Sequence, residues 1–357
     1  MIKLLIVDDS ALMRRQLMNL FQAAGDFEVR PARNGDEAVR ENRDFQPDVM
    51  TLDINMPEMD GLTALSLIMA ERPVAVVMVS SLTNEGALAT FEALNLGAVD
   101  YIAKPGGTIS LSIDRITEEL VGKVRSAARS RPRGKASVAA TVARRMQEER
   151  KKVAAASAAL AAPRGAGDGL LVVGASTGGP RALEIVLSGL PVSFPWPVLV
   201  AQHMPAAFTR AFAERLNQCC ALQVVEAGSA LPVEAGKIYI ARGGADMVLA
   251  SRAGKLTVLP MPENSQFLWH PSVELLGRSV LEHYDPKRVT AVLLTGMGYD
   301  GSDAFAEIKK RGGRTIAESE ESAVVYGMPA ELVAKGGASL VLAVERVASQ
   351  LSTWAGR

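Results

Sequence analysis

The sequence KLLIVDD at residues 3–9 is a short apolar run that ends in two aspartates. Similar runs follow within the first 120 residues, and the segments between them carry apolar side chains at helical spacing, such as Met13, Leu17 and Leu20. The runs cover residues 3–7, 47–54, 74–79 and 101–103. Short runs that are apolar on both faces and alternate with amphipathic helices are typical of a parallel sheet. We therefore predict an α/β fold here, with a doubly wound parallel sheet.

Polar side chains lie where these runs end, and parallel strands bring their carboxyl ends to one edge of a sheet. The residues are Asp8, Asp9, Asp53, Ser80 and Lys104. Three carboxylates at one edge repel each other, and a hard divalent cation with oxygen ligands relieves that repulsion, which favours Mg²⁺. A hydroxyl and a lysine at the same edge suit a phosphoryl group held on a carboxylate. The alternative is that each aspartate is a separate, solvated loop residue.

Residues 1–122 resemble a response-regulator receiver domain, which has a flavodoxin-like fold. The resemblance rests on the motifs IVDDSALMR, TLDINMPEMDG, VVMVSS and DYIAKP. It implies that Asp53 accepts a phosphoryl group from a histidine kinase. It also implies that Asp8, Asp9, Asp53 and the backbone carbonyl of Asn55 hold Mg²⁺.

The same resemblance implies how the phosphoryl group is bound and sensed. Ser80 and Lys104 would contact the phosphoryl oxygens. Tyr101, three residues before the lysine, would be the aromatic switch residue.

The length and the charge pattern predict how the chain is divided. A chain of 357 residues is long enough for two domains, and its net charge of zero hides three unlike segments. Residues 1–122 hold 10 basic and 19 acidic side chains, residues 123–169 hold 12 and 3, and residues 170–357 hold 17 of each. We expect a receiver at 1–122, a basic linker rich in Ala, Pro and Gly at 123–169, and a catalytic domain at 170–350. The linker, with a helical stretch at 138–160, is either a solvated tether or a segment that rests against the acidic receiver.

The composition is ordinary for a soluble globular protein, with 48% hydrophobic and 22% charged residues. A neutral total charge gives no support for binding nucleic acid or a membrane surface. No stretch approaches the roughly 20 apolar residues of a membrane span, and the run before Asp8 is too short for a signal peptide. The adjacent Cys219 and Cys220 are poorly placed for a disulfide and fit a reducing compartment. We therefore expect a cytoplasmic protein that does not insert into a membrane.

A second decisive stretch, LLVVGASTGGP at residues 170–180, contains G-x-S-x-G between an apolar strand and a helical pattern. That context places the hydroxyl of Ser176 on a tight, exposed turn and favours acyl transfer. The alternative is a phosphate-binding loop, because glycines before a helix also cradle anions. The dinucleotide fingerprint, however, needs a glycine in place of Ser176, and the Walker motif needs a Gly-Lys pair that this stretch lacks.

A serine nucleophile needs a base, and the chain has three histidines. His203 follows the apolar run 197–201 at the expected end of a strand, so a parallel sheet would place it beside Ser176. His283 lies in a helical surface context, and His270 lies between a tryptophan and a proline in an irregular region. His203 is therefore the candidate base.

The carboxylate that would orient this histidine is expected at another strand end. The run 289–294 leads into TGMGYDG at residues 295–301, which makes Asp300 the candidate. The glycines on either side of Met297 leave backbone N–H groups there available to a developing oxyanion. The alternative for Asp300 is an ordinary turn residue.

Residues 170 to about 340 resemble the catalytic domain of the CheB family of chemotaxis protein-glutamate methylesterases, whose sheet is Rossmann-like. GASTGGP matches the nucleophile Ser176 with its neighbour Thr177, QHMP matches the base His203, and TGMGYDG matches Asp300 and the backbone donor Met297. The implied activity is hydrolysis of glutamate γ-methyl esters on the cytoplasmic helices of methyl-accepting chemotaxis receptors, for sensory adaptation. Deamidation of glutamine is also implied, and no cofactor is expected for the esterase. In this family the unphosphorylated receiver covers the active site, and phosphorylation favours an open form.

The chain departs from the family pattern at two positions near the site. Where the family commonly has APGG-x-HM, Arg242 replaces a proline and Asp246 replaces a histidine. We expect these changes to affect the substrate groove. Two other functions stay open: a transcription factor, for which a neutral output region of about 190 residues is unfavourable, and a non-catalytic scaffold.

Overall fold

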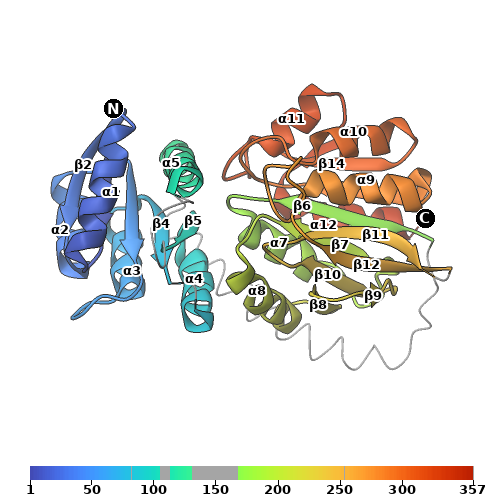
Figure 1. Cartoon of the computed structure of the whole chain (residues 1–357), viewed down its shortest axis with the longest axis horizontal. Coiled ribbons are helices and arrows are strands. Elements are labelled where there is room, and N and C mark those ends of the chain that lie inside the picture. Colours follow the sequence, from blue (N-terminus) through green and yellow to red (C-terminus); the bar gives the residue numbers. More distant parts are fainter. Residues whose placement is uncertain (82, 105–112, 131–167, 253, 357) are drawn as a thin grey trace. The chain divides into compact units, whose positions relative to one another are not determined.

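The structure is a computed structural model that describes residues 1–81, 83–104, 113–130, 168–252 and 254–356. The chain divides into two compact units, Met1–Arg145 and Met146–Arg357, and each is described here by itself (Figure 1). Most of the expected linker at 123–169, including its expected helical stretch at 138–160, lies outside the described residues. Helix α5 (Ile113–Arg129) continues past residue 122. The expected domain boundaries and the role of the linker stay predictions.

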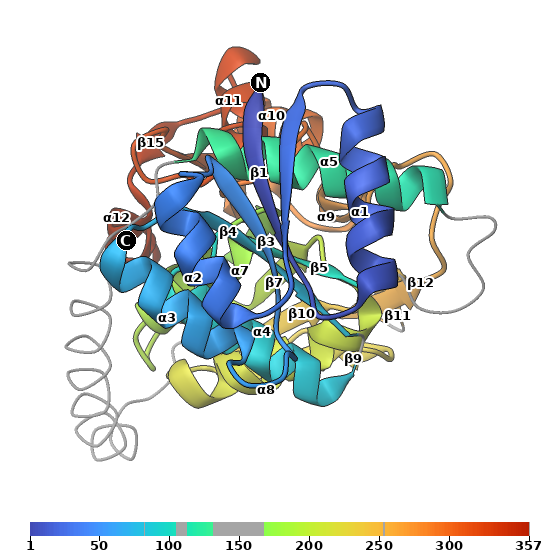
Figure 2. The ribbon, with the colours of Figure 1, turned by 90° about the vertical axis from the view of Figure 1, so that its left-hand side faces the viewer.

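The N-terminal unit is a five-stranded sheet between two layers of helices. Its strands are β1 (Ile2–Val7), β2 (Phe27–Ala32), β3 (Val49–Asp53), β4 (Ala75–Ser80) and β5 (Asp100–Ala103), and its other helices are α1 (Ala11–Ala23), α2 (Gly35–Asp44), α3 (Gly61–Glu71) and α4 (Asn84–Leu96). The strands lie in the order β2-β1-β3-β4-β5, and every neighbouring pair is parallel. Helices α1 and α5 cover one face of the sheet and α2, α3 and α4 cover the other (Figure 2). The predicted doubly wound parallel sheet is confirmed.

Strand β2 is the element of this unit that the apolar runs do not predict. It lies at the edge of the sheet, where only Phe27 and Ala32 are buried and the residues between them are exposed or partly exposed. Pro31 is acceptable there because an edge strand leaves one row of backbone groups unpaired. An edge strand therefore has no continuous apolar run to reveal it.

The C-terminal unit is built on a seven-stranded parallel sheet. Its strands are β6 (Leu170–Ala175), β7 (Val198–Gln202), β8 (Gln223–Ala227), β10 (Lys237–Ala241), β13 (Val289–Leu293), β14 (Arg314–Glu318) and β15 (Leu340–Leu342). They lie in the order β15-β14-β13-β6-β7-β10-β8. Its helices are α7 (Gly179–Ser188), α8 (Ala206–Cys219), α9 (Val273–His283), α10 (Ser302–Lys310), α11 (Met328–Ala334) and α12 (Val344–Ala355), with a 3₁₀ turn at Pro286–Arg288. The second predicted α/β sheet is also confirmed.

A small antiparallel sheet, which the sequence pattern does not predict, lies beside α9. It contains β9 (Leu231–Pro232), β11 (Asp246–Arg252) and β12 (Lys255–Met261) in the order β11-β12-β9. Met247 and Leu249 of β11 share a buried cluster with Val273 and Leu276 of α9. This packing fixes both ends of the irregular residues 262–272 that join β12 to α9. No helix within the described residues is both long and apolar enough to cross a membrane.

Candidate active site

The three candidate catalytic residues follow three neighbouring strands of the seven-stranded sheet. Ser176 comes directly after β6, His203 directly after β7, and Asp300 lies in the loop after β13. Strand β6 lies between the other two, and all three are parallel. The strand order reverses at β6, and the carboxyl edge at such a reversal is where open α/β sheets bind ligands. The sheet therefore brings together three side chains that are far apart in sequence.

Ser176 lies on a tight turn between β6 and α7. Its amide donates to the carbonyl oxygen of Thr295 at 2.9 Å, and its own carbonyl oxygen accepts from the amide of Gly179 at 2.7 Å. The left-handed residue of the turn is Gly178, with φ 76°, and Ser176 has no positive φ. Glycine adopts this conformation without the clash that a Cβ atom causes. The turn therefore presents the Ser176 hydroxyl while the serine backbone stays unstrained.

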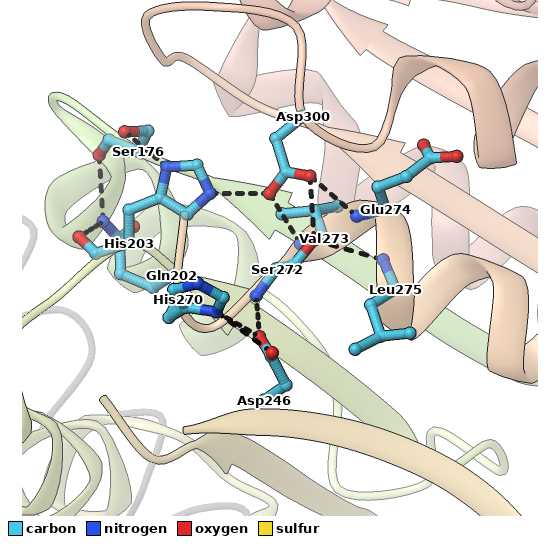
Figure 3. A network of polar contacts seen from close by, with 10 residues as sticks. All are labelled: Ser176, Gln202, His203, Asp246, His270, Ser272, Val273, Glu274, Leu275 and Asp300. Atoms are coloured by element: carbon cyan, nitrogen blue, oxygen red, sulfur yellow. Dashed lines mark hydrogen bonds and ion pairs between the residues drawn. The ribbon is translucent and has the colours of Figure 1, made fainter. Parts of the chain in front are cut away.

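The imidazole of His203 joins the serine to the aspartate (Figure 3). Its Nδ1 lies 3.0 Å from Ser176 Oγ, and its Nε2 lies 2.8 Å from Asp300 Oδ2. An ionised carboxylate can only accept, so Nε2 carries a hydrogen and the neutral ring has its lone pair on Nδ1. Nδ1 is therefore the nitrogen that can take a proton from the Ser176 hydroxyl.

Asp300 is buried in a cradle of donors at the start of α9, with an exposed fraction of 3%. Its Oδ1 accepts from Ser272 Oγ at 3.0 Å and from the amide of Glu274 at 2.9 Å, and its Oδ2 also accepts from the amide of Val273 at 2.7 Å. Burial by itself raises the pKa of Asp300, but the hydrogen bond and charge of His203 and the two amides outweigh it and hold the pKa below its usual value. The carboxylate is therefore ionised where it faces the imidazole.

The loop after β13 lies against the nucleophile. A Cβ atom added to Gly296 would lie only 2.8 Å from Ser176 Cβ, so a larger residue does not fit there. Met297, the expected oxyanion donor, is the next residue. Thr177 is buried, and its carbonyl oxygen accepts from Thr295 Oγ1 at 2.9 Å, which joins the turn to this loop. The backbone around Met297 is therefore held beside Ser176.

The N-terminal unit has a second cluster at the carboxyl edge of its sheet. Ligand oxygens of Asp8, Asp9 and Asp53 all lie within 4.8 Å of one another. Lys104 Nζ lies 2.6 Å from Asp53 Oδ2 and 3.2 Å from Asp8 Oδ2. Burial raises the pKa of Asp53 and the charge of Asp8 raises it further, against the opposing effect of Lys104. The amide of Asn55 also donates to Asp53 Oδ1 at 3.3 Å. Crowded carboxylate oxygens of this kind fit a hard divalent cation.

Two other residues expected at this cluster make contacts of their own. The Ser80 hydroxyl donates to the carbonyl oxygen of Gly86 at 3.1 Å, and none of its hydrogen bonds in the described part of the chain reaches Asp53. Tyr101 has an exposed fraction of 2%, and Lys123 Nζ donates to its carbonyl oxygen at 3.0 Å. The structure thus brings together the aspartates and Lys104, while the Ser80 hydroxyl is bound to the Gly86 carbonyl and Tyr101 is buried.

Known proteins are similar to both units of this chain. Residues 171–351 match the CheB methylesterase family, and residues 4–113 match the response regulator receiver domain. Over its whole length the chain is 54% identical to protein-glutamate methylesterase/protein-glutamine glutaminase 3 of Rhodospirillum rubrum, of which it covers 97%. The chain belongs to the CheB methylesterase family.

Two further proteins agree with this assignment. A protein-glutamate methylesterase/protein-glutamine glutaminase of Rhodopseudomonas palustris is 51% identical over 99% of this chain and 98% of its own. The crystal structure of the CheB methylesterase catalytic domain of Thermotoga maritima has a TM-score of 0.50 and 36% identity, and covers 52% of this chain and 98% of that domain.

The two departures from the CheB pattern have different surroundings. Arg242 is exposed, whereas Asp246, at the start of β11, is 1% exposed. A side chain buried in this way does not itself line a substrate groove, so an effect of Asp246 on the groove would be indirect and stays a prediction. Its carboxylate instead accepts from His270 Nδ1, which lies 3.0 Å from both of its oxygens. The third histidine, His283, is exposed at the end of α9.

Three residues around the triad are not predicted from the sequence. The indole of Trp269 stacks on the His203 ring, with centroids 5.6 Å apart and planes 4° apart. Gln202 Nε2 donates to the carbonyl oxygens of Ser176 and His203, both at 3.0 Å. Ser272 caps α9 and holds Asp300. A serine before a helical pattern is a signal for an N-cap, but nothing in the local sequence connects it with an aspartate 28 residues later.

Proposed function

We propose that this chain hydrolyses glutamate γ-methyl esters on methyl-accepting chemotaxis receptors and deamidates receptor glutamines. The two relatives described above, which match 99% or more of this chain, are named for these two activities. The single observation that carries the proposal is the continuous contact from Ser176 Oγ through His203 to Asp300. An enzyme that acts on the cytoplasmic helices of receptors would work in the cytoplasm. The glutamate side chains that it forms on the receptor would contribute to sensory adaptation.

In the proposed reaction, His203 Nδ1 takes the proton of Ser176 as its Oγ attacks the γ-carbonyl carbon. Asp300 holds the ring through Nε2 and stabilises the imidazolium that forms. The imidazolium then gives its proton to the leaving oxygen, and methanol departs. Water activated by the same nitrogen hydrolyses the acyl-enzyme, and a glutamine amide would release ammonia by the same steps.

The negative oxygen of the tetrahedral intermediate needs preorganised donors. We assign this role to the backbone N–H of Met297, with Thr177 beside it. The closeness of Gly296 to Ser176 supports the assignment, because it holds that loop within reach of a substrate carbonyl. The positive end of α7, which begins three residues after Ser176, also favours negative charge there.

We propose that the receiver domain controls this reaction through phosphorylation of Asp53 by a chemotaxis histidine kinase. Asp8, Asp9, Asp53 and the Asn55 carbonyl would hold Mg²⁺, which when bound supplies positive charge to neutralise the incoming phosphoryl oxygens. Lys104 already contacts Asp53 and would move its ammonium group to a phosphoryl oxygen. Ser80 would have to leave the Gly86 carbonyl to do the same, and Tyr101 would report the change.

The experiment measures methanol release from methyl-labelled receptor membranes, with and without a small phosphodonor. Ser176→Ala is expected to abolish release, and Asp53→Asn to abolish only its stimulation by the phosphodonor. A differential stability of about 1.4 kcal/mol between active and inactive forms gives a tenfold change in their ratio. If wild type releases no methanol while Asp53 still accepts phosphate, the scaffold alternative is favoured; a DNA-binding assay tests the transcription-factor alternative.

A further inference from the structure

Residues 264–272, here called the β12–α9 segment, bring two different groups to the triad. Trp269 lies flat against the His203 ring. Three residues later, Ser272 donates its hydroxyl hydrogen to Asp300, and the next two amides of the chain complete the carboxylate's set of donors. One irregular segment therefore contacts both the base and its carboxylate.

Asp246 anchors this segment at three points, of which Figure 3 draws the two at His270 and Ser272. Its Oδ1 accepts from the amide of Ser272 at 2.8 Å, and its Oδ2 accepts from the amide of Asn264 at 3.0 Å. The ring of His270 donates from Nδ1 to the same carboxylate. All three partners belong to the β12–α9 segment, while Asp246 itself begins β11, whose next residues pack on α9.

Within the described part of the chain, the hydrogen bonds of the Asp246 and His270 side chains join these two residues to each other and to the segment, and none reaches Ser176. The side chain of Asp246 is fully buried and that of His270 is 12% exposed. A buried carboxylate needs a full set of donors, and losing one donor leaves an unsatisfied charge. The position of the segment therefore depends on the match between this carboxylate and its three donors.

We propose that Asp246 and His270 are positioning residues for the triad, a second carboxylate–imidazole pair that sets where Ser272 meets Asp300 and where Trp269 meets His203. One path runs from Asp246 through the amide and hydroxyl of Ser272 to Asp300. The other runs from His270 to the adjacent Trp269 and its stack on His203. The rate measurements that test this inference rest on the proposed esterase function. The fluorescence measurement that tests it rests on the geometry alone.

The test compares Asp246→Asn, His270→Ala and His270→Asn with wild type and with Tyr239→Phe. Asparagine at position 246 places an amide N–H group where the carboxylate accepted hydrogen bonds, so it faces other donors. Alanine at position 270 removes the imidazole N–H that donates to Asp246. Tyr239→Phe is the matched control, because the buried Tyr239 hydroxyl accepts from the amide of Glu234 at 2.9 Å in a loop outside the site. Thermal melts give the stability lost by each variant.

We expect kcat for methyl-ester hydrolysis to fall about 10-fold to 100-fold in Asp246→Asn and His270→Ala, since misplacing a catalytic group by about 1 Å costs up to that much. KM should stay within about twofold, because the buried pair does not meet substrate. His270→Asn keeps a donor near the position of Nδ1 and should retain kcat within about threefold. Tyr239→Phe should lose stability but keep kcat.

A second readout does not depend on activity. The emission of Trp269, obtained by subtracting the spectrum of Trp269→Phe, should change in Asp246→Asn and His270→Ala at temperatures where both are folded, and stay as in wild type in His270→Asn and Tyr239→Phe. The inference would be overturned if Asp246→Asn kept the wild-type emission and kcat. It would also be overturned if Tyr239→Phe lost as much stability as Asp246→Asn and its kcat fell by the same factor. If wild type releases no methanol from any receptor, the proposed function fails, and the emission of Asp246→Asn still decides whether the pair positions Trp269.

Discussion

Replacing Asp300 by asparagine tests the central contact of the site. The carboxylate accepts four hydrogen bonds, two on each oxygen. Whichever way the new amide turns, one acceptor is lost and an N–H group faces an amide of α9. The negative charge beside His203 disappears in either orientation, so the imidazolium formed during attack by Ser176 is no longer stabilised.

The magnitude follows from the distance between the two charges. Asp300 Oδ2 lies 2.8 Å from His203 Nε2. This places the charge centres about 4 Å apart, where opposite charges at an effective dielectric constant of about 20 attract by about 4 kcal/mol. A barrier change of about 1.4 kcal/mol is tenfold in rate. We therefore expect kcat to fall about a thousandfold.

The assay is methanol release under saturating phosphodonor, with substrate in excess. Asp303→Asn is the matched control, because Asp303 is an exposed aspartate in α10 whose carboxylate pairs with Lys335 and not with a triad residue. Asp303→Asn should hydrolyse the ester at the wild-type rate. A folded Asp300→Asn variant with kcat within tenfold of wild type would refute the reasoning, since the carboxylate would then contribute little to the charge balance of the reaction.

Three other predictions test different parts of the molecule. Gly296→Ala should lower kcat at least 100-fold, because its Cβ would press on Ser176; an unchanged methanol-release rate would contradict the close approach. Lys104→Gln should abolish stimulation by the phosphodonor while basal release stays at the wild-type level, and stimulation that survives would show that the Asp53–Lys104 contact is dispensable. The pKa of Asp300 is lowered in the fold, so its contribution to stability is complete above its unfolded pKa of about 4 and is lost as pH falls through the folded pKa. Melting temperatures measured from pH 6 to pH 3 should therefore fall less steeply in Asp300→Asn than in wild type, and parallel curves would contradict this.

Much of the fold follows from short-range patterns. The strands β1, β3, β4, β6, β7 and β13 are buried on both faces, so each shows as a continuous apolar run. The edge strand β2 has no such run, because the residues between Phe27 and Ala32 are exposed or partly exposed. The apolar stretches of β11 and β12 do not by themselves show that these strands pair in a separate antiparallel sheet. Polar residues at strand ends reveal the candidate site before any strand order is known, since every parallel strand ends at the same edge.

The sequence alone was thus sufficient to name Ser176, His203 and Asp300 as candidates, because the chain has three histidines and only His203 follows a buried strand. Which nitrogen of His203 faces the serine, and what holds Asp300, depended on tertiary structure. Strand order places β13 beside β6, and packing of β11 on α9 carries Trp269 and Ser272 to the site. These contacts join residues 26 to 118 positions apart. No local pattern encodes them, because they arise only when distant segments share one buried surface.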